Sequence, residues 1–374
     1  MKRIQSRYIA PLLLALIFCS CQSFNQNIEI TASGNSFTQQ VDSLVISKMN
    51  HYNIPGLAIG LVAGDTILYT KGFGVKCISD SHPVTEETIF HTASVSKLFT
   101  AQAILLLVEK GELSLDDKLL TIVPELKYKD KNVEKITIES LLNHTSGLPD
   151  VHNYHWEYNN QSEKSLEDYV LDLNLKLKWE PATKYHYSNL GYNILGYVIE
   201  RITNTSFDTY LKENILNKSG MTNSDFRYFK IADSLKVSPH SRYRITGKVY
   251  ERQTYPYTRE QAPGSTLNSS ATDLSKWMIS FLQLLESNDA ENVYAKMIEP
   301  GFDPYPYIGH GFQLSTIDSK AAIGHYGGDK GFRSYLLMIP EEKIGLVLLA
   351  NCDYEEDFRQ EILHPIARLM FANF

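Results

Sequence analysis

Residues 90–97 read FHTASVSK, and this stretch governs how the rest of the chain is interpreted. It contains Ser94 and Lys97, the only Ser-x-x-Lys of the sequence. The apolar residues that follow recur with a helical period up to Gly111, which predicts a helix over residues 96–110. Because side chains three positions apart share one face of a helix, the hydroxyl and the amine are expected to be neighbours.

A serine hydroxyl beside a lysine amine is a candidate nucleophile with its base. The hydroxyl is a poor nucleophile at neutral pH, and an amine whose pKa is lowered by burial can remove its proton. Taken alone, however, the pattern favours a plainer interpretation, in which Ser94 caps the helix and Lys97 is solvated. Other parts of the chain have to decide between the two.

Two further short stretches follow Ser94 along the chain, and their order matters for the interpretation. Residues 187–189 read YSN at the start of an apolar helical stretch, and residues 325–327 read HYG just before the C-terminal strands. The three elements resemble the SxxK, YxN and KTG boxes of the serine β-lactamase and penicillin-binding protein family, in its class C-like branch. The resemblance spans roughly residues 37–370. Three further stretches also resemble that family: GELSLDD at 111–117, HTSGLP at 144–149 and PGS at 263–265.

The resemblance implies a role for each matching residue. Ser94 would attack a carbonyl and become acylated, while Lys97 and Tyr187 would share the proton transfers. Which of the two is the base stays open, since Tyr187, with an ordinary pKa near 10, needs a neighbouring cation to lower that value. Asn189 would hold the amide of a bound acyl group. The backbone N–H groups of Ser94 and Gly328 would form the oxyanion hole.

The third box departs from the commonest pattern, because His325 stands where lysine is usual. A histidine with an ordinary pKa near 6.5 is only partly cationic at neutral pH, so capture of a substrate carboxylate is weakened. This favours a peptidase or esterase over an efficient β-lactamase. His325, Gly327 and Gly328 are expected to bind substrate, since glycines let a substrate backbone approach the strand. The alternative for His325 is an ordinary hydrogen-bonded strand histidine.

These residues predict a serine hydrolase that acts through a Ser94 acyl-enzyme on an amide or ester carbonyl. Its substrate would be a small molecule or peptide: a β-lactam, a D-amino-acid peptide or an ester. The alternative is a catalytically silent, penicillin-recognising binding or sensor module on the same fold. The joint presence of Ser94, Lys97, Tyr187 and Asn189 argues against that alternative. We expect no cofactor and no metal, because no CxxC, HExxH or His/Cys cluster with ligand spacing occurs.

Three other stretches offer competing sites. Residues 158–160 form a second Tyr-x-Asn, but within a polar segment. Residues 218–220 read KSG and mimic the third box, although Gly220 is better explained as a helix terminator. His144 and Ser146 suggest a Ser-His triad, but no Gly-x-Ser-x-Gly elbow is present.

The order of the expected elements predicts an α+β fold. An antiparallel sheet would be assembled from both chain ends and flanked by helices, with a mostly helical lobe inserted. The resemblance implies the β-lactamase/transpeptidase-like architecture for a domain over residues 37–374. Its α/β lobe would span about 37–80 plus 305–374, and its helical lobe about 85–300.

The individual elements follow from periodicity and turn residues. The expected strands cover residues 56–63, 66–70, 334–339 and 344–349. The expected helices cover residues 37–52, 96–110, 190–203, 271–286 and 355–371. Pro365 is expected to kink or break the last of these helices.

The first 20 residues predict a secretory signal peptide. Lys2 and Arg3 make the start basic, and residues 9–18 form an apolar run too short to cross a bilayer comfortably. The competing interpretation is a buried N-terminal helix. We therefore expect an exported protein.

Cys21 follows the apolar run and resembles a bacterial lipoprotein cleavage site. The match is loose, because Phe18 and Cys19 replace the aliphatic and small residues usual there. A lipid on Cys21 would tether the protein to a membrane through the polar residues 21–36, and simple secretion is the alternative. The expected location is the periplasm, or the outer membrane as a lipoprotein.

The composition narrows the class of protein and the kinds of partner that we expect. Of the 374 residues, 43% are hydrophobic and 21% are charged, which is ordinary for a soluble globular protein. The net charge is −7 and no run of Lys and Arg stands out, so a nucleic-acid partner is not expected. Beyond the predicted signal and Cys21, Cys77 and Cys352 are the remaining cysteines. They could form one disulfide but not a disulfide framework.

Overall fold

A computed structural model describes residues 36–286, 292–355 and 358–374. The predicted signal peptide, Cys21 and nearly all of the predicted tether lie outside these residues. Within them, none of the helices combines the length and the apolar character needed to cross a bilayer.

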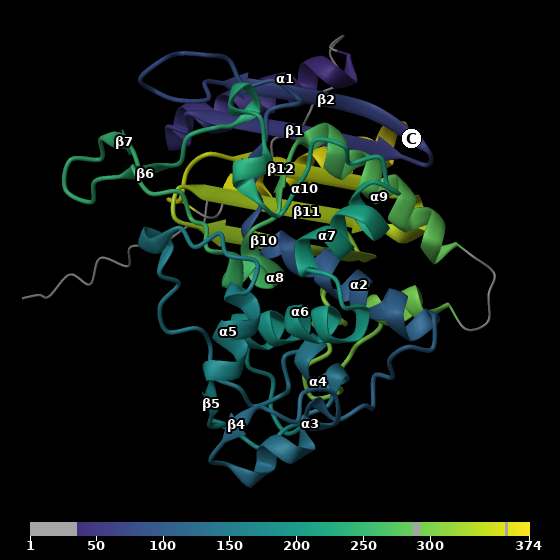
Figure 1. The fold of residues 1–374 in the computed structure, drawn as a ribbon. Coiled ribbons are helices and arrows are strands. Elements are labelled where there is room, and N and C mark those ends of the chain that lie inside the picture. Colours follow the sequence, from purple (N-terminus) through teal and green to yellow (C-terminus); the bar gives the residue numbers. More distant parts are fainter. Residues whose placement is uncertain (1–35, 287–291, 356–357) are drawn as a thin grey trace, which may run out of the picture. The chain divides into compact units, whose positions relative to one another are not determined.

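A six-stranded antiparallel sheet joins the two ends of the described chain (Figure 1). Its strand order is β2-β1-β12-β11-β10-β9. The central pairing brings β1 onto β12, with Ile59 opposite Leu348. The predicted assembly of one sheet from both chain ends is therefore confirmed. The strands are β1 (Gly56–Ala63), β2 (Thr66–Gly74), β9 (Gln313–Ile317), β10 (Lys320–Asp329), β11 (Phe332–Ile339) and β12 (Ile344–Ala350).

Both faces of this sheet are covered, which explains why β1 and β12 are apolar at nearly every position. Leu57, Ile59 and Leu61 face the layer of α1 (Phe37–Tyr52) and α10 (Phe358–Asn373). Ala58 and Val62 face the opposite layer, which contains α9 (Ala271–Leu285). Strands that alternate between two cores carry no polar face, because neither face meets water.

The chain between β2 and β9 is mostly helical, as predicted. Its central helix, α2 (Ser96–Glu109), is buried on almost every side. It contacts α6 (Asn189–Thr203) and α8 (Ala262–Ser265), which also contact each other, and the three helices enclose the candidate site. The other helices of this part are α3 (Leu119–Ile122), α4 (Ile138–Leu142), α5 (Ser165–Asp172) and α7 (Phe207–Leu211). The short strands are β3 (Phe90–His91), β4 (Lys127–Tyr128), β5 (Asn174–Leu175), β6 (His240–Arg242), β7 (Val249–Glu251) and β8 (Asn268–Ser269).

The last helix is not broken at Pro365. Helix α10 runs through this residue, although proline cannot donate a hydrogen bond to the carbonyl four residues earlier. Ile362, Leu363 and Ile366 are fully buried on either side of it. Their packing into the apolar layer that α10 shares with α1 and the sheet outweighs the lost bond.

The disulfide that the sequence allowed is not formed. Cys77 and Cys352 are both free and buried. Burial raises the pKa of the Cys352 thiol to about 12. A thiol held in this protonated state is a poor nucleophile for thiol–disulfide exchange.

Gly60 in β1 allows helix α9 to approach the sheet closely. A Cβ at this position would lie 2.3 Å from Ser275 Oγ and 2.9 Å from the Ala271 carbonyl oxygen. We expect Gly60→Ala to lower the free energy of unfolding by about 1–3 kcal/mol, because the two layers would have to separate. Thermal or denaturant unfolding measures the change.

The matched control is Gly191→Ala in helix α6, where the nearest atom to a new Cβ is 3.6 Å away. That variant should gain up to about 1 kcal/mol from its higher helix propensity. Equal effects of the two substitutions would contradict the packing explanation.

Candidate active site

Ser94 lies in a short 3₁₀ helix, Ala93–Val95, between β3 and α2. It is half-buried, whereas the residues on both sides of it are buried. Ala93 adopts the left-handed conformation with φ of 48°. A non-glycine residue in that region costs about 1–3 kcal/mol, so the turn persists only because its surroundings hold it.

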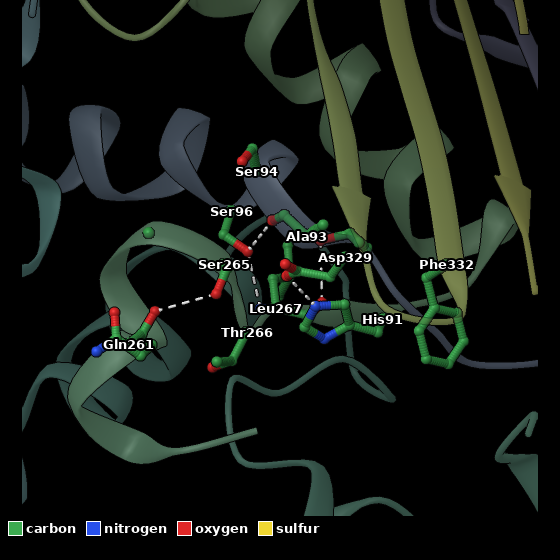
Figure 2. Close-up of polar contacts among 12 residues, drawn as sticks. His91, Ala93, Ser94, Ser96, Gln261, Ser265, Thr266, Leu267, Asp329 and Phe332 are labelled. Carbon is green, nitrogen blue, oxygen red and sulfur yellow. Dashed lines mark hydrogen bonds and ion pairs between the residues drawn. The ribbon is translucent and has the colours of Figure 1, made fainter. Parts of the chain in front are cut away.

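Three side-chain hydrogen bonds hold the turn, and Figure 2 shows those of Ser96. Ser96 Oγ donates to the Ala93 carbonyl oxygen at 2.6 Å. Ser96 Oγ also accepts a hydrogen bond from the Leu267 N–H at 2.9 Å. On the sheet side, Ser334 Oγ donates to the Thr92 carbonyl oxygen at 2.6 Å. The Ser94 backbone is thus fixed from both the helical part and the sheet.

A His91–Asp329 pair ties β3 to the end of β10 (Figure 2). His91 Nε2 lies 2.8 Å from Asp329 Oδ2, and the His91 side chain is completely buried. Gly327 allows the close approach of β10, because a Cβ there would lie 2.2 Å from the Thr92 carbonyl oxygen. No sequence motif indicated this pair, whose members are 238 residues apart.

The Lys97 side chain is completely buried and has three polar partners. Its Nζ lies 3.1 Å from Ser94 Oγ, 2.6 Å from Asn189 Oδ1 and 2.7 Å from the Gly264 carbonyl oxygen. The solvated lysine of the plainer interpretation is therefore wrong. Burial lowers the pKa of Lys97 to about 7, against the opposing effect of the nearby carboxylates of Asp150 and Asp329.

The nature of these partners fixes what a neutral Lys97 would do. Asn189 Oδ1 and the Gly264 carbonyl can only accept hydrogen bonds, so they take both hydrogens of a neutral amine. Its one lone pair is then left for the third partner, Ser94. A hydroxyl can donate, so the arrangement is suited to removing the proton of Ser94 Oγ.

Gly264 is held in place by its neighbours in the segment around α8. Thr100 Oγ1 of helix α2 donates to the carbonyl oxygen of Pro263 at 2.7 Å. Just before α8, the buried Arg259 forms an ion pair with the equally buried Asp208, with Nε and Oδ2 2.7 Å apart. The PGS stretch was noticed in the sequence, but its use of a backbone carbonyl was not predictable from it.

Tyr187 lies beside this centre, with its ring centroid 5.0 Å from Lys97 Nζ. Removal from water raises the pKa of Tyr187 well above its ordinary value, and a hydrogen bond with the Ser94 side chain lowers it less. The phenol therefore stays protonated. The neighbouring cation does not achieve the lowering that Tyr187 would need to act as a base.

The His144 ring packs against the ring of Tyr187. The centroid of its ring lies 4.4 Å from that of Tyr187 and 5.1 Å from that of Tyr192. Its Nδ1 accepts a hydrogen bond from the Ser188 N–H at 3.2 Å. Burial holds the pKa of His144 well below its usual range, so the ring is neutral.

The competing sites do not form comparable arrangements. Ser146 Oγ faces the Leu148 N–H, and His144 is occupied by the Tyr187 stretch. In residues 158–160, Tyr158 is 70% exposed. Gly220 has a φ of 72°, as expected for the residue that ends a helical stretch.

Asn189, the first residue of α6, is engaged at both ends of its amide. Oδ1 accepts from Lys97, while Nδ2 donates to Asp150 Oδ1 at 3.0 Å and lies 3.3 Å from Oδ2. The Asn189 backbone N–H donates to the same Oδ1 at 2.7 Å. Asp150 was missed in the sequence because nothing in its spacing marks it.

His325 is buried on β10, and its ring centroid lies 6.2 Å from that of Tyr187. Its Nδ1–H donates to the Tyr326 carbonyl oxygen at 2.6 Å. Nε2 therefore carries a lone pair, and it has no hydrogen-bond partner within the described chain. Burial, followed by the Lys97 charge, lowers the pKa of His325 to about 3. The expectation of a partly cationic His325 at neutral pH is not met.

The end of β10 offers a free edge beside Ser94. Strand β9 pairs with β10 only from Lys320 to Gly324, so residues 325–329 have no backbone partner from β9. The Tyr326 N–H instead donates to the side-chain Oε1 of Gln313 at 3.2 Å. Gly328 is exposed there. The proposed pair of oxyanion donors, the N–H groups of Ser94 and Gly328, remains a prediction of the resemblance.

Comparison with known proteins gives consistent matches. Residues 41–369 match the family model described as Beta-lactamase. Protein flp of Staphylococcus aureus (strain MW2) is 26% identical over 332 residues, which cover 86% of this chain but only 64% of that protein. Penicillin-binding protein 4* of Bacillus subtilis (strain 168) is 28% identical, with 85% of this chain and 72% of that protein covered.

Solved structures show the same architecture. The octameric penicillin-binding protein homologue from Pyrococcus abyssi superposes with a TM-score of 0.77 at 27% identity, covering 89% of this chain and 77% of that one. A class C beta-lactamase gives a TM-score of 0.72 at 20% identity, covering 89% and 96%, and at that identity it shows the fold alone. The predicted β-lactamase/transpeptidase-like fold is confirmed.

Ser96 tests how the strained turn is held. We expect Ser96→Ala to lower the free energy of unfolding by about 1–3 kcal/mol, because two buried backbone groups would lose their partner. Denaturant unfolding measures the change. Ser43→Ala, which removes an exposed hydroxyl on α1, is the control and should change stability by less than about 0.5 kcal/mol. A Ser96 variant as stable as this control would contradict the assignment.

Proposed function

The chain belongs to the β-lactamase family, and from this premise we propose that it is a serine hydrolase that forms an acyl-enzyme at Ser94. Membership also confirms the resemblance found in the sequence. One observation carries the proposal: Lys97 Nζ lies 3.1 Å from Ser94 Oγ, and its two other partners can only accept. A solvated lysine would not have this set of partners, and Ser94 is the partner among the three whose hydroxyl can give a proton to the neutral amine.

In the proposed reaction, neutral Lys97 takes the proton of Ser94 Oγ as this oxygen bonds to the substrate carbonyl carbon. The resulting oxyanion would accept from the backbone N–H groups of Ser94 and Gly328. Collapse breaks the bond to the leaving group, which receives a proton from the Tyr187 phenol while the phenol oxygen takes one from the Lys97 ammonium. Water then attacks the acyl group by the same steps in reverse order, and the acid is released.

Lys97 is the base in this proposal, and Tyr187 is a donor. A phenol with a raised pKa cannot supply a base near neutral pH, whereas an amine with a pKa of about 7 matches the working pH. The protonated Tyr187 would hand its hydrogen to the departing atom and regain one from Lys97. The proposal thus gives the role of base to Lys97, where the sequence left it open between Lys97 and Tyr187.

The proposed substrates are compounds with an amide or ester carbonyl, including β-lactams, D-amino-acid peptides and esters. The names of two relatives, both penicillin-binding proteins, support the β-lactam part of this range. The neutral His325 provides no charge for a substrate carboxylate. Efficient hydrolysis of carboxylated β-lactams is accordingly disfavoured.

Covalent labelling tests the proposed nucleophile. We expect a fluorophosphonate probe to modify the full chain at one site, and mass spectrometry should place the label on Ser94. Ser94→Ala should lose the label, because Ser94 carries the hydroxyl that is hydrogen-bonded to Lys97 Nζ. Ser146→Ala, the control, should keep it. Undiminished labelling of folded Ser94→Ala would overturn the proposal.

The pH dependence of labelling tests the assignment of the base. Lys97 can accept a proton only when neutral, so the rate should be level above the Lys97 pKa of about 7. Below it, the rate should fall about tenfold per pH unit. His325→Gln should show the same midpoint, because burial keeps His325 neutral throughout this range. Loss of the midpoint in His325→Gln would instead assign the titration to the histidine.

A further inference from the structure

Asp150 places a carboxylate directly against the amide that would contact the acyl group. Both of its oxygens lie within 3.3 Å of Asn189 Nδ2. Because Lys97 occupies Oδ1 of the same amide, both ends of the Asn189 side chain are already engaged. A neutral acyl amide would have to compete with Asp150 for Nδ2.

Asp150 itself retains the capacity to bind a donor. A carboxylate offers about four acceptor positions. The backbone N–H groups of Asn189 and Val151 and the Asn189 Nδ2 donate to Oδ1, whereas Oδ2 receives the longer contact from Nδ2. The residue is exposed, so a substrate group can reach the remaining positions. The subsite thus presents a negatively charged hydrogen-bond acceptor to the substrate.

A second, independent group points the same way. His325 Nε2 is buried and unpartnered within the described chain. Because its Nδ1 hydrogen is used by the Tyr326 carbonyl, Nε2 presents a lone pair. A substrate carboxylate would meet repulsion there, whereas an N–H group would find an acceptor.

Two carboxylates, those of Asp150 and Asp329, act on Lys97 and on the phenol of Tyr154. Asp329 is paired with His91, and Arg333 donates to the Asp329 carbonyl oxygen. Lys330 lies over the Trp156 ring, 5.3 Å from its centroid. Asp150, whose hydrogen-bond partners are amide N–H groups, is therefore the carboxylate placed to attract a substrate cation.

We propose that the acyl subsite beside Asp150 binds a protonated amine, so that the substrates are amides or esters of amino acids with a free amino group. This inference rests on the proposed acyl-enzyme at Ser94 and narrows its substrate class. N-acylated and carboxylated acyl groups are then the disfavoured substrates. The competing explanation is that Asp150 only caps helix α6 through the Asn189 backbone N–H.

A matched substrate series at pH 7 separates the two explanations. Its members are the p-nitrophenyl esters of alanine, N-acetylalanine and N-succinylalanine, each as both enantiomers. An α-amino group with a pKa near 7.7–8.0 is mostly protonated at this pH. We expect kcat/KM to be about tenfold or more higher for the free amine than for the acetyl compound, and lowest for the succinyl compound.

Asp150→Asn removes the charge but keeps an oxygen that can cap α6. It should lower kcat/KM for the free amine by about tenfold and leave the acetyl compound within about twofold. Asp130→Asn is the control, since Asp130 caps a short helix through Asn132 elsewhere in the chain. That variant should leave the whole series unchanged.

The outcomes distinguish this inference from the proposed function. Absence of fluorophosphonate labelling at Ser94 would sink both. Labelled enzyme that prefers the acetyl compound, or shows no preference in the series, overturns the amine subsite alone. An equal loss for all three esters in Asp150→Asn would assign Asp150 to capping. Inactivation rates with free-amino and N-acetyl aminoalkylphosphonate diphenyl esters give the same comparison without turnover, and equal or absent inactivation overturns it.

Discussion

The arrangement of the candidate site depends on the burial of one amine, that of Lys97. Lys97 Nζ is removed from water and surrounded by Ser94, Asn189 and the Gly264 carbonyl. A buried ammonium is costly unless its partners satisfy it, and the same burial makes the neutral amine accessible near neutral pH. Two partners that only accept leave the lone pair for the third. The base role proposed for Lys97 therefore depends on the identity of its neighbours.

The rest of the fold serves to bring those neighbours together. Ser94 comes from a turn before α2, Asn189 from the start of α6, and Gly264 from α8. The sheet supplies the opposite wall, where the glycine at position 327 lets β10 touch the turn. Because Ala93 is held in a strained conformation, the turn requires the buried bonds of Ser96 around it. Rigidity here keeps the hydroxyl within reach of the amine.

Family membership fixes the architecture more firmly than the specificity, since one fold carries many activities. In this chain the specificity that we propose comes from hydrogen-bond acceptors in the cleft. Asp150 occupies the Asn189 amide, and His325 presents a lone pair where a lysine would present charge. In the proposed substrate binding, the charge of Asp150 acts beside Asn189, whereas the lone pair of His325 acts beside Tyr187.

The sequence by itself determined the strands at both chain ends, the long helices and the boxes at Ser94, Tyr187 and His325, because periodicity and motif spacing are local properties. Only the tertiary structure decided the roles of Asp150 and of the Gly264 carbonyl. Neither has a signal in the chain, since a backbone oxygen looks alike at every position and Asp150 gains its role from a contact with Asn189. The protonation states were also beyond the sequence: a pKa depends on burial, which packing alone sets.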